Sequence, residues 1–337
     1  MRIFGSNLLP WRGRAASDEA RRTREAVARV LAMNPGLRYA PHCEERLSRA
    51  LMTSLEYTDK LVASLPPACA ADAHAWSSDP AIRAFFATPD DLARAFSRSE
   101  AMRDYFERQA DTTEGYAVLG MAMTERHVLG VAQEGGSIRH DVPQTTLCFG
   151  DHRVRISSDS EASLRAEIGR RMVDQLALEG VASLATNRRK LVKHSRELLE
   201  KRVALLERQG TGMRAVLGVP PVTETDGLAR IQAEMKENAQ ALAKLRVPGK
   251  QGERELDGVC DVLSKPSEHI YVKSRSIRVD MMNVVQPEGS QAGRLVEFHF
   301  ACIPGNPAIT RAFVLARFPR CELLRGGLHI DAAMQAI

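Results

Sequence analysis

The middle of the chain carries a repeat of leucines spaced by seven residues, formed by Leu184, Leu191, Leu198 and Leu205. Because residues seven apart lie on one face of an α-helix, this repeat predicts a long helix over about residues 159–209. A second stretch, 226–246, has apolar residues alternately three and four apart, which is typical of a shorter amphipathic helix. We predict that the two helices form an antiparallel hairpin.

One polar residue, Asn238, falls on the apolar stripe of the shorter helix. A polar residue in such a seam often fixes the pairing register and lowers stability. The longer helix has a second row of apolar residues beside its leucines, formed by Val192, Leu199 and Leu206. The opposite seam position is interrupted by Arg188, so we expect a one-sided seam rather than a long regular coiled coil.

The apolar period changes from 3.6 to 2 near residue 113, which indicates β-strands. Short strands are predicted at 115–123, 125–133, 144–149 and 152–157, with a turn at 134–137 and a break at Gly150–Asp151. Strand character returns after the hairpin, within 269–285, 294–303 and 309–318. Neither group suffices for a sandwich, so we predict one sheet or small barrel that the hairpin interrupts. Contiguous small domains are the alternative.

The first 110 residues have a helical pattern throughout. Two amphipathic helices are followed by three short units, each of which begins with a helix-capping residue and ends with an aromatic residue. The predicted fold class is therefore α+β, with a helical region before a mainly antiparallel β domain. The predicted boundaries are 1–110 for the helical region, 111–158 plus 264–325 for the split β domain, 159–247 for the inserted hairpin with its tip at 210–225, and 326–337 for a C-terminal tail.

Composition places the chain among ordinary globular proteins, since 44% of its 337 residues are hydrophobic and 26% are charged. The six cysteines have no CxxC spacing, and no apolar run approaches the ~18 residues of a membrane-spanning helix. The N-terminal apolar patch is too short for a signal peptide. We therefore expect a cytoplasmic protein with free thiols and no transmembrane segment.

No stretch carries a catalytic or cofactor motif: GxSxG, GxGxxG and the Walker loop are all absent. We expect a non-catalytic protein that needs no cofactor. A metal-dependent enzyme is the third hypothesis, because several possible ligands lie on or beside predicted strands, although without the spacing of a known metal motif. These residues are His127, His140, His152, Asp141 and Asp151.

The long helix is strongly basic between residues 188 and 202, where the net charge of +5 equals that of the whole chain. The basic residues are Arg188, Arg189, Lys190, Lys193, Arg196, Lys201 and Arg202. They predict either a solvated helix flank or a surface that follows a phosphate backbone. No aromatic residues lie among them, so stacking on single-stranded bases is not indicated. A nucleic-acid-associated protein is therefore the second hypothesis.

The predicted tip of the hairpin is unusually apolar for a loop far from a core. Its apolar residues are Met213, Val216, Leu217, Val219 and Val222. An exposed apolar tip indicates a contact site for a protein partner, a second copy or a membrane surface, whereas a loop folded back on the arms would simply bury these residues. The leading hypothesis is an interaction or adaptor protein that uses this hairpin to bind a protein partner or to self-associate.

Overall fold

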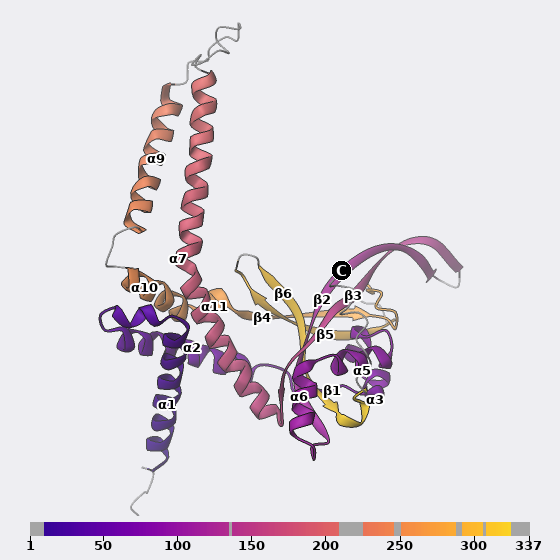
Figure 1. Ribbon diagram of the computed structural model, residues 1–337. Helices are drawn as coiled ribbons and strands as arrows, with labels where there is room; N and C mark the ends of the chain where they lie inside the picture. The colour runs from indigo at the N-terminus through magenta and orange to yellow at the C-terminus, as the bar shows by residue number, and fades with distance from the viewer. Residues whose placement is uncertain are drawn as a thin grey trace, which may run out of the picture. The chain divides into compact units, whose positions relative to one another are not determined.

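The computed structural model describes residues 10–134, 137–208, 225–245, 251–287, 292–305 and 308–324. It has an α+β fold, as predicted, with helices at the N-terminus, an antiparallel sheet and a long helix pair (Figure 1). The chain divides into two compact units. Unit 1 comprises Met1–Glu56 and Val173–Pro266, and unit 2 comprises Tyr57–Met172 and Ser267–Ile337.

Unit 1 is helical. Its elements are α1 (Pro10–Met33), η1 (Pro35–Tyr39), the first part of α2 (Cys43–Ala63), most of α7 (Glu161–Arg208), α9 (Thr225–Leu245) and α10 (Gln251–Ser264). Helix α10 packs closely against α7 at Gly180. A Cβ atom at this position would lie only 2.6 Å from the Cα of Val259. Ser54 donates a buried hydrogen bond to the carbonyl of Leu263, 2.6 Å away, which links α2 to α10. Glycine at position 180 therefore permits close helix packing.

Unit 2 is built on a six-stranded sheet. Its strands are β1 (Cys69–Ala70), β2 (Glu114–Glu134), β3 (Ser137–Ser158), β4 (Tyr271–Val279), β5 (Arg294–Ile303) and β6 (Ile309–Pro319). The order is β3-β2-β6-β5-β4, with antiparallel pairing between neighbours, and β1 pairs in parallel with β6. The last strand in sequence is thus the central strand of the sheet.

The two outer strands of this sheet are joined by the segment 283–286. Leu147 of β3 donates a hydrogen bond to the carbonyl of Asn283 at 2.9 Å, and Val285 donates one to the carbonyl of Thr145 at 2.7 Å. On its other side, Val285 forms an antiparallel bridge with Val279 at the end of β4. The sheet therefore curls until one short segment bridges β3 and β4.

Strands β2 and β3 are each much longer than predicted from the sequence, which had divided each of them in two. Gly150–Asp151 does not end a strand: Asp151 has φ 49° and lies at a register shift opposite Gly120–Ala122. Aspartate tolerates the left-handed region better than most residues, and such a bulge bends a strand while pairing continues. The pairing of β2 with β6 ends at Met121, and beyond Thr145, the last residue of β3 that pairs with the segment 283–286, the two strands continue as a two-stranded ribbon.

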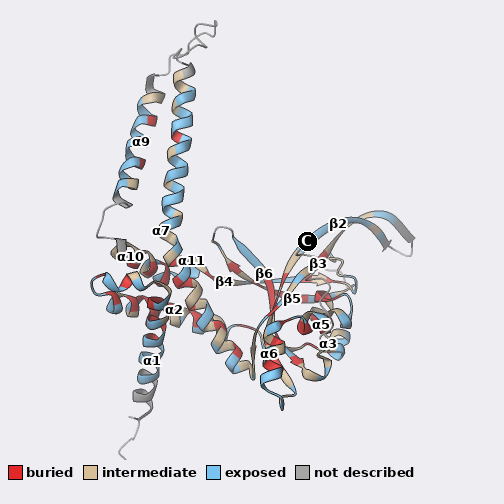
Figure 2. Ribbon diagram, in the orientation of Figure 1, coloured by how far each residue is buried: buried red, intermediate tan, exposed pale blue. Residues whose placement is uncertain are grey.

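Four short helices cover one face of the sheet: α3 (Ala73–Ser78), α4 (Pro80–Phe85), α5 (Pro89–Ser97) and α6 (Glu100–Arg108). The side chains of Asp79, Thr88 and Ser99 cap α4, α5 and α6. The sequence predicted a hydroxyl cap for each unit, which is confirmed for Thr88 and Ser99, whereas a carboxylate caps α4. Their aromatic residues form the main buried cluster (Figure 2), in which Phe96 stacks on Phe318 of β6 with ring centroids 4.6 Å apart. These helices thus position the α4–α6 loops beside the edge strand β3.

The opposite face of the sheet packs against the end of α2 and the start of α7. Phe313 and Leu315 of β6 contact Leu164 and Ile168 of α7 in a second core cluster. Arg165 holds the two helices together, because its guanidinium donates hydrogen bonds to the backbone carbonyls that end α2, at 2.7–3.1 Å. Such fork-like donation is available to arginine and not to lysine.

Candidate functional site

The helix pair of unit 1 is held by a narrow seam between α7 and α9. Leu198 of α7 and Ile231 of α9 are buried in it. Asn238 is also buried, and its Nδ2 donates to the carbonyl of Leu191 at 3.0 Å and to Ser195 Oγ at 3.1 Å. Asn238 therefore lies in the helix interface, as its place on the apolar stripe predicted.

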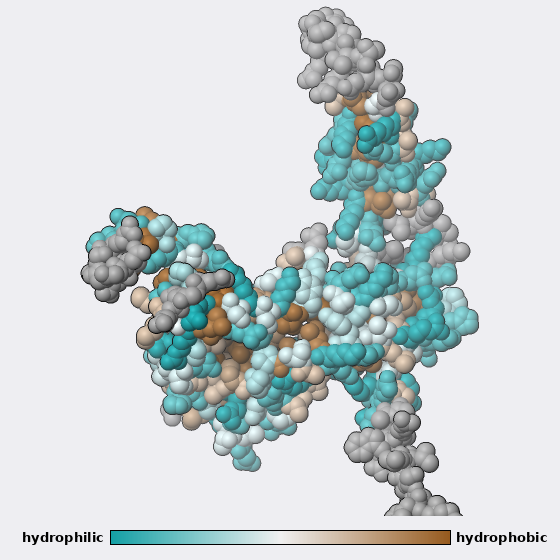
Figure 3. Space-filling model, turned by 180° about the vertical axis from the view of Figure 1, so that it is seen from behind, coloured by the Kyte–Doolittle hydropathy of each residue, from teal (hydrophilic) through white to brown (hydrophobic). Residues whose placement is uncertain are grey.

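A second apolar row runs along α7 beside this seam, with one residue every seven positions. We call it the outer row, and it consists of Leu178, Ala185, Val192, Leu199 and Leu206. Val192 and Leu199 remain 53% and 51% exposed, and the adjacent Val203 is 50% exposed. On the face seen in Figure 3, the helix pair is mostly hydrophilic. The outer row is thus an apolar stripe that α9 leaves exposed.

The basic residues of α7 are spread over an exposed helix surface. Six of the seven are exposed, and only Arg202 is half-buried. Two of them form ion pairs one turn away: Lys193 with Glu197 at 3.8 Å and Arg196 with Glu200 at 3.2 Å. Exposed pairs of this kind contribute little to stability. The residues therefore form a solvated basic surface on α7.

The apolar tip residues Met213, Val216, Leu217, Val219 and Val222 lie outside the described residues. Their exposure stays a prediction from the sequence.

The possible metal ligands lie in different surroundings. His127 is exposed on β2, where its Nδ1 is 3.1 Å from Thr145 Oγ1, and His140 and Asp141 lie on the ribbon part of β3. His152 is half-buried at the base of β3. Among the residues that the structure describes, no three His, Cys, Asp or Glu side chains gather in a way that would hold a metal ion. Their placement gives the metal hypothesis no support.

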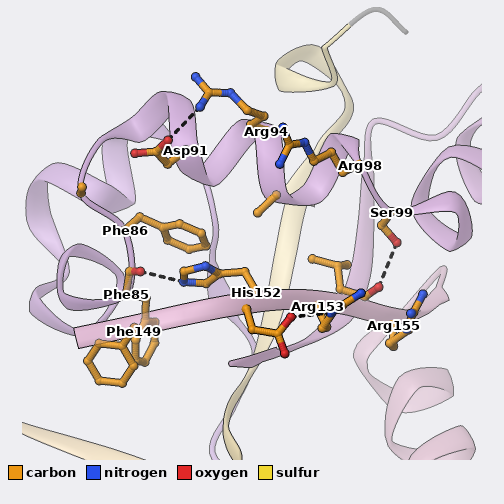
Figure 4. Close-up of a pocket in the computed structure, with 14 residues that line it drawn as sticks. Phe85, Phe86, Asp91, Arg94, Arg98, Ser99, Phe149, His152, Arg153 and Arg155 are labelled. Carbon is orange, nitrogen blue, oxygen red and sulfur yellow. Dashed lines mark hydrogen bonds and ion pairs between the residues drawn. The ribbon is translucent and has the colours of Figure 1, made fainter. Parts of the chain in front are cut away.

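A pocket of about 590 Å³ lies in unit 2, between α5 and the edge strand β3 (Figure 4). Arg94 and Arg98 reach it from α5 and its C-terminal end, and Arg153 and Arg155 reach it from β3. The remaining lining residues are Phe85, Phe86, Ala87, Asp91, Ala95, Ser99, Phe149, Asp151, His152 and Val154. Four arginines on two separate elements therefore line one cavity.

Both carboxylates of the pocket are engaged by arginine. Asp91 accepts a hydrogen bond from Arg94 at 3.0 Å, and Asp151 accepts hydrogen bonds from Arg153 at 2.7 Å and Arg311 at 2.8 Å. The hydrogen bonds from Arg311 and Arg153 hold the pKa of Asp151 below its ordinary value of 3.8. With four arginines and two aspartates, the lining has a formal net charge of +2. The aspartates orient arginines without cancelling their charge.

His152 forms part of the pocket floor. Its ring stacks on Phe86 with centroids 4.6 Å apart, and its Nε2 lies 2.8 Å from the carbonyl oxygen of Phe85. A carbonyl only accepts, so Nε2 carries a proton in both charge states of the ring. Burial is the main cause that lowers the pKa of His152 from its ordinary value of 6.5. The floor is therefore an uncharged aromatic surface at neutral pH.

Sequence reasoning did not find this pocket. The signal was present only as two local pairs, Arg94 with Arg98 and Arg153 with Arg155. Residues four apart share one face of a helix, which points Arg94 and Arg98 to the same side. The bulge at Asp151 and the hydrogen bond that Ser99 Oγ donates to the carbonyl of Val154, at 3.0 Å, then bring β3 alongside. The spacing of these residues in the sequence does not indicate that the two pairs lie close together.

No family model matches this chain, and neither a curated protein nor a solved structure is similar to it. Within the described residues, no helix is both long enough and apolar enough to cross a membrane. All six cysteines are free thiols. The helix pair with its outer row and the arginine-lined pocket are the two features from which function is inferred.

Proposed function

We propose that this chain is a non-catalytic interaction protein of the cytoplasm, and that its helix pair binds a further helix from a protein partner or a second copy. The observation that carries the proposal is the exposed outer row of α7. Its residues Val192 and Leu199 stay half exposed although they continue a regular repeat. An apolar stripe of constant period is the surface that a partner helix covers in a bundle.

The seven-residue period of the outer row favours a partner helix that winds around α7. A straight α-helix has 3.6 residues per turn, so a row with one residue every seven positions drifts by about 20° per repeat. The drift disappears when helices wind around each other with a left-handed twist. The row from Leu178 to Leu206 keeps this spacing over four intervals, which favours a wound bundle over an isolated pair.

The charged residues beside the outer row indicate which kind of partner helix would bind there. Arg189 and Arg196 lie beside the outer row, four residues after Ala185 and Val192. A partner helix that covers the row would face these guanidinium groups at its flank. Opposite charges at such flanking positions set partner choice and orientation in coiled coils. We therefore expect a partner helix whose flank carries Asp or Glu, and Glu197 and Glu200 of a second copy meet that requirement.

The decisive experiment compares two double variants of the full chain by light scattering after size exclusion. Val192→Gln with Leu199→Gln makes the outer row polar, whereas Lys193→Gln with Lys201→Gln changes exposed residues outside the row. We expect wild type and the lysine variant to exceed the 37.2 kDa of a single chain and the row variant to approach it. Circular dichroism should be equal for all three, because the seam with α9 is untouched.

If the wild type is a single chain in solution, a pull-down of partner proteins with each variant is the second experiment. The row variant should then lose a protein that the wild type and the lysine variant both retain. A single-chain wild type whose captured proteins are unchanged in the row variant contradicts the proposal. The same assays with polar residues at Leu217 and Val219 test the separate prediction for the tip.

A nucleic-acid-associated function is the second proposal, favoured by the exposure of six basic residues on α7. Arg188, Arg189 and Lys190 are consecutive, exposed and without a carboxylate at ion-pair distance among the described residues. Replacing all three by Gln should abolish a gel shift that weakens steeply between about 50 and 200 mM salt. The outer-row variant serves as the control, since it keeps these charges. No shift by wild type at low salt contradicts this alternative.

A further inference from the structure

The arginine-lined pocket of unit 2 plays no part in the interaction proposed for the helix pair. It is a separate cavity of about 590 Å³, within the range of roughly 300–1,000 Å³ typical of small-molecule sites. We propose that it binds a soluble organic phosphate, whose phosphoryl group is held by Arg98, Arg153 and Arg155.

The arrangement of the guanidinium groups favours an anion over any neutral ligand. Arg94 and Arg98 lie on one side of the cavity and Arg153 and Arg155 on the other (Figure 4). Four like charges on residues that line one cavity repel one another, and only two of the lining residues, Asp91 and Asp151, are acidic. An anion between the two sides relieves this repulsion and accepts hydrogen bonds from both.

Phosphate fits this arrangement better than a single carboxylate. A phosphate monoester carries about −1.5 to −2 charges near pH 7 and three acceptor oxygens, which matches the net +2 of the lining. Its oxygens point in different directions, so donors from opposite sides can bind at once. Arginine is the usual residue for such bidentate contacts. A carboxylate offers two oxygens in one plane and a single charge.

The carboxylates of the pocket support a binding role for the arginines rather than a purely structural one. Asp151 is shared by Arg153 and Arg311, and Asp91 engages Arg94, so each acid fixes the direction of a guanidinium group at the rim. The side chains of Arg94 and Arg153 nevertheless remain 51% and 60% exposed. Preoriented but solvent-accessible donors lose little conformational entropy when an anion arrives.

The rest of the cavity accounts for an organic group beside the phosphate. The volume of about 590 Å³ greatly exceeds that of one phosphate ion. Ala87 and Ala95 supply small apolar walls, and the half-buried ring of His152 supplies part of the floor. The site therefore suits a small phosphorylated molecule whose carbon skeleton lies against these residues.

Isothermal titration of the full chain tests the site with glycerol 3-phosphate, adenosine monophosphate and pyrophosphate, and with the uncharged glycerol and adenosine. We expect saturable binding of glycerol 3-phosphate or adenosine monophosphate with Kd below about 1 mM, and none of either uncharged compound. Absence of saturable binding for both organic phosphates overturns the proposal, whether or not pyrophosphate binds. Binding only to vesicles that contain phosphatidic acid, and not to the soluble probes, also overturns it.

The site is located by a matched pair of variants. Arg98→Gln with Arg155→Gln removes one guanidinium from each side, whereas Arg126→Gln removes an exposed arginine of β2 outside the pocket. Loss of two charge-assisted contacts should weaken binding by at least about tenfold, and the control should stay within about twofold of wild type. Equal weakening by both variants means general attraction to a basic protein and contradicts the assignment.

The wild type provides a readout that does not depend on the variants folding. The ring protons of His152, identified in an NMR spectrum by their loss in His152→Gln, should shift during titration with the phosphate that binds. The shift should saturate with the Kd found by calorimetry. A bound phosphate that leaves the His152 signals unchanged lies elsewhere, which overturns the proposal. Failure of the helix-pair experiments has no bearing on this result.

Discussion

Asn238 Nδ2 lies 3.0 Å from the backbone carbonyl oxygen of Leu191, and this hydrogen bond ties α9 to α7 across a residue that is only 5% exposed. The oxygen of the same amide group has no such partner in the described part of the chain. Among the described residues, no donor lies within hydrogen-bond distance of the buried Asn238 Oδ1. One side chain thus both specifies the pairing of the two helices and weakens it.

Two substitutions of Asn238 should shift stability in opposite directions. Asn238→Asp replaces the donor with a charged acceptor that faces the carbonyl of Leu191, so the free energy of unfolding of the helix pair should fall by about 2–4 kcal/mol. Asn238→Leu removes the unsatisfied oxygen and should raise it by about 1 kcal/mol. Thermal unfolding followed at 222 nm, the α-helical band, measures both. A stabilising aspartate would contradict the described contact.

Two glycines of α7 should respond oppositely to alanine. Both lie in the helix interior, where alanine is favoured over glycine by about 1 kcal/mol. A Cβ at Gly169 would lie 3.7 Å from Val62, an ordinary contact, so Gly169→Ala should stabilise by about that amount. A Cβ at Gly180 would lie 2.6 Å from Val259 Cα, so Gly180→Ala should destabilise by roughly 1–3 kcal/mol. Urea unfolding of the two variants checks both signs.

His152 should make unit 2 less stable in mild acid. Burial lowers its pKa in the folded chain, against the opposing effects of the Phe85 carbonyl, Asp91 and Asp151, while the unfolded chain keeps a pKa near 6.5. Below that pH the unfolded state binds more protons, so the free energy of unfolding falls as the pH drops from about 6.5 toward the folded-state pKa. Stability is fully present above this window.

The check is a comparison of wild type with His152→Gln by urea unfolding at about pH 7.5 and about pH 5, on either side of the ordinary histidine pKa. Glutamine can still donate to the carbonyl of Phe85 but does not titrate. The variant should therefore lose less stability in acid than wild type does. Equal acid losses in both proteins would show that His152 does not contribute.

Local patterns predicted the helix pair well. The expected ranges 159–209 and 226–246 compare with Glu161–Arg208 and Thr225–Leu245 in the structure, because periodicity and capping act within each helix. The strands were predicted less well: β3 was divided at Gly150–Asp151, where the structure has a bulge, and β2 was divided at Thr124, which pairs in regular register with Cys148. A bulge is tolerated because neighbouring strands hold the backbone, which is tertiary information.

The candidate sites show the same limit. The outer row is visible in the sequence, since Val192, Leu199 and Leu206 repeat every seven residues, but which row faces α9 depends on packing. The pocket joins Arg98 with Arg155, which are 57 residues apart and lie on elements of different type. Only the bulged geometry of β3 and the fold of the α4–α6 layer bring them together. Helix α10 was also not predicted, although its buried residues Leu256, Val259, Val262 and Leu263 repeat at helical spacing.

The central position of β6 has a consequence for how the chain is made. Strands β2 and β3 leave the ribosome first, but the strand that completes β2 pairing, Ile309–Pro319, is the last one synthesised. At roughly 5–20 residues per second, about 10–30 s pass between the end of β3 and the arrival of β6. During that interval, the edge of β2 that β6 will cover lies open to other chains. Unpaired strand edges pair readily with other chains, so nascent chains of this protein are most open to edge-to-edge association before Ile309–Pro319 is made.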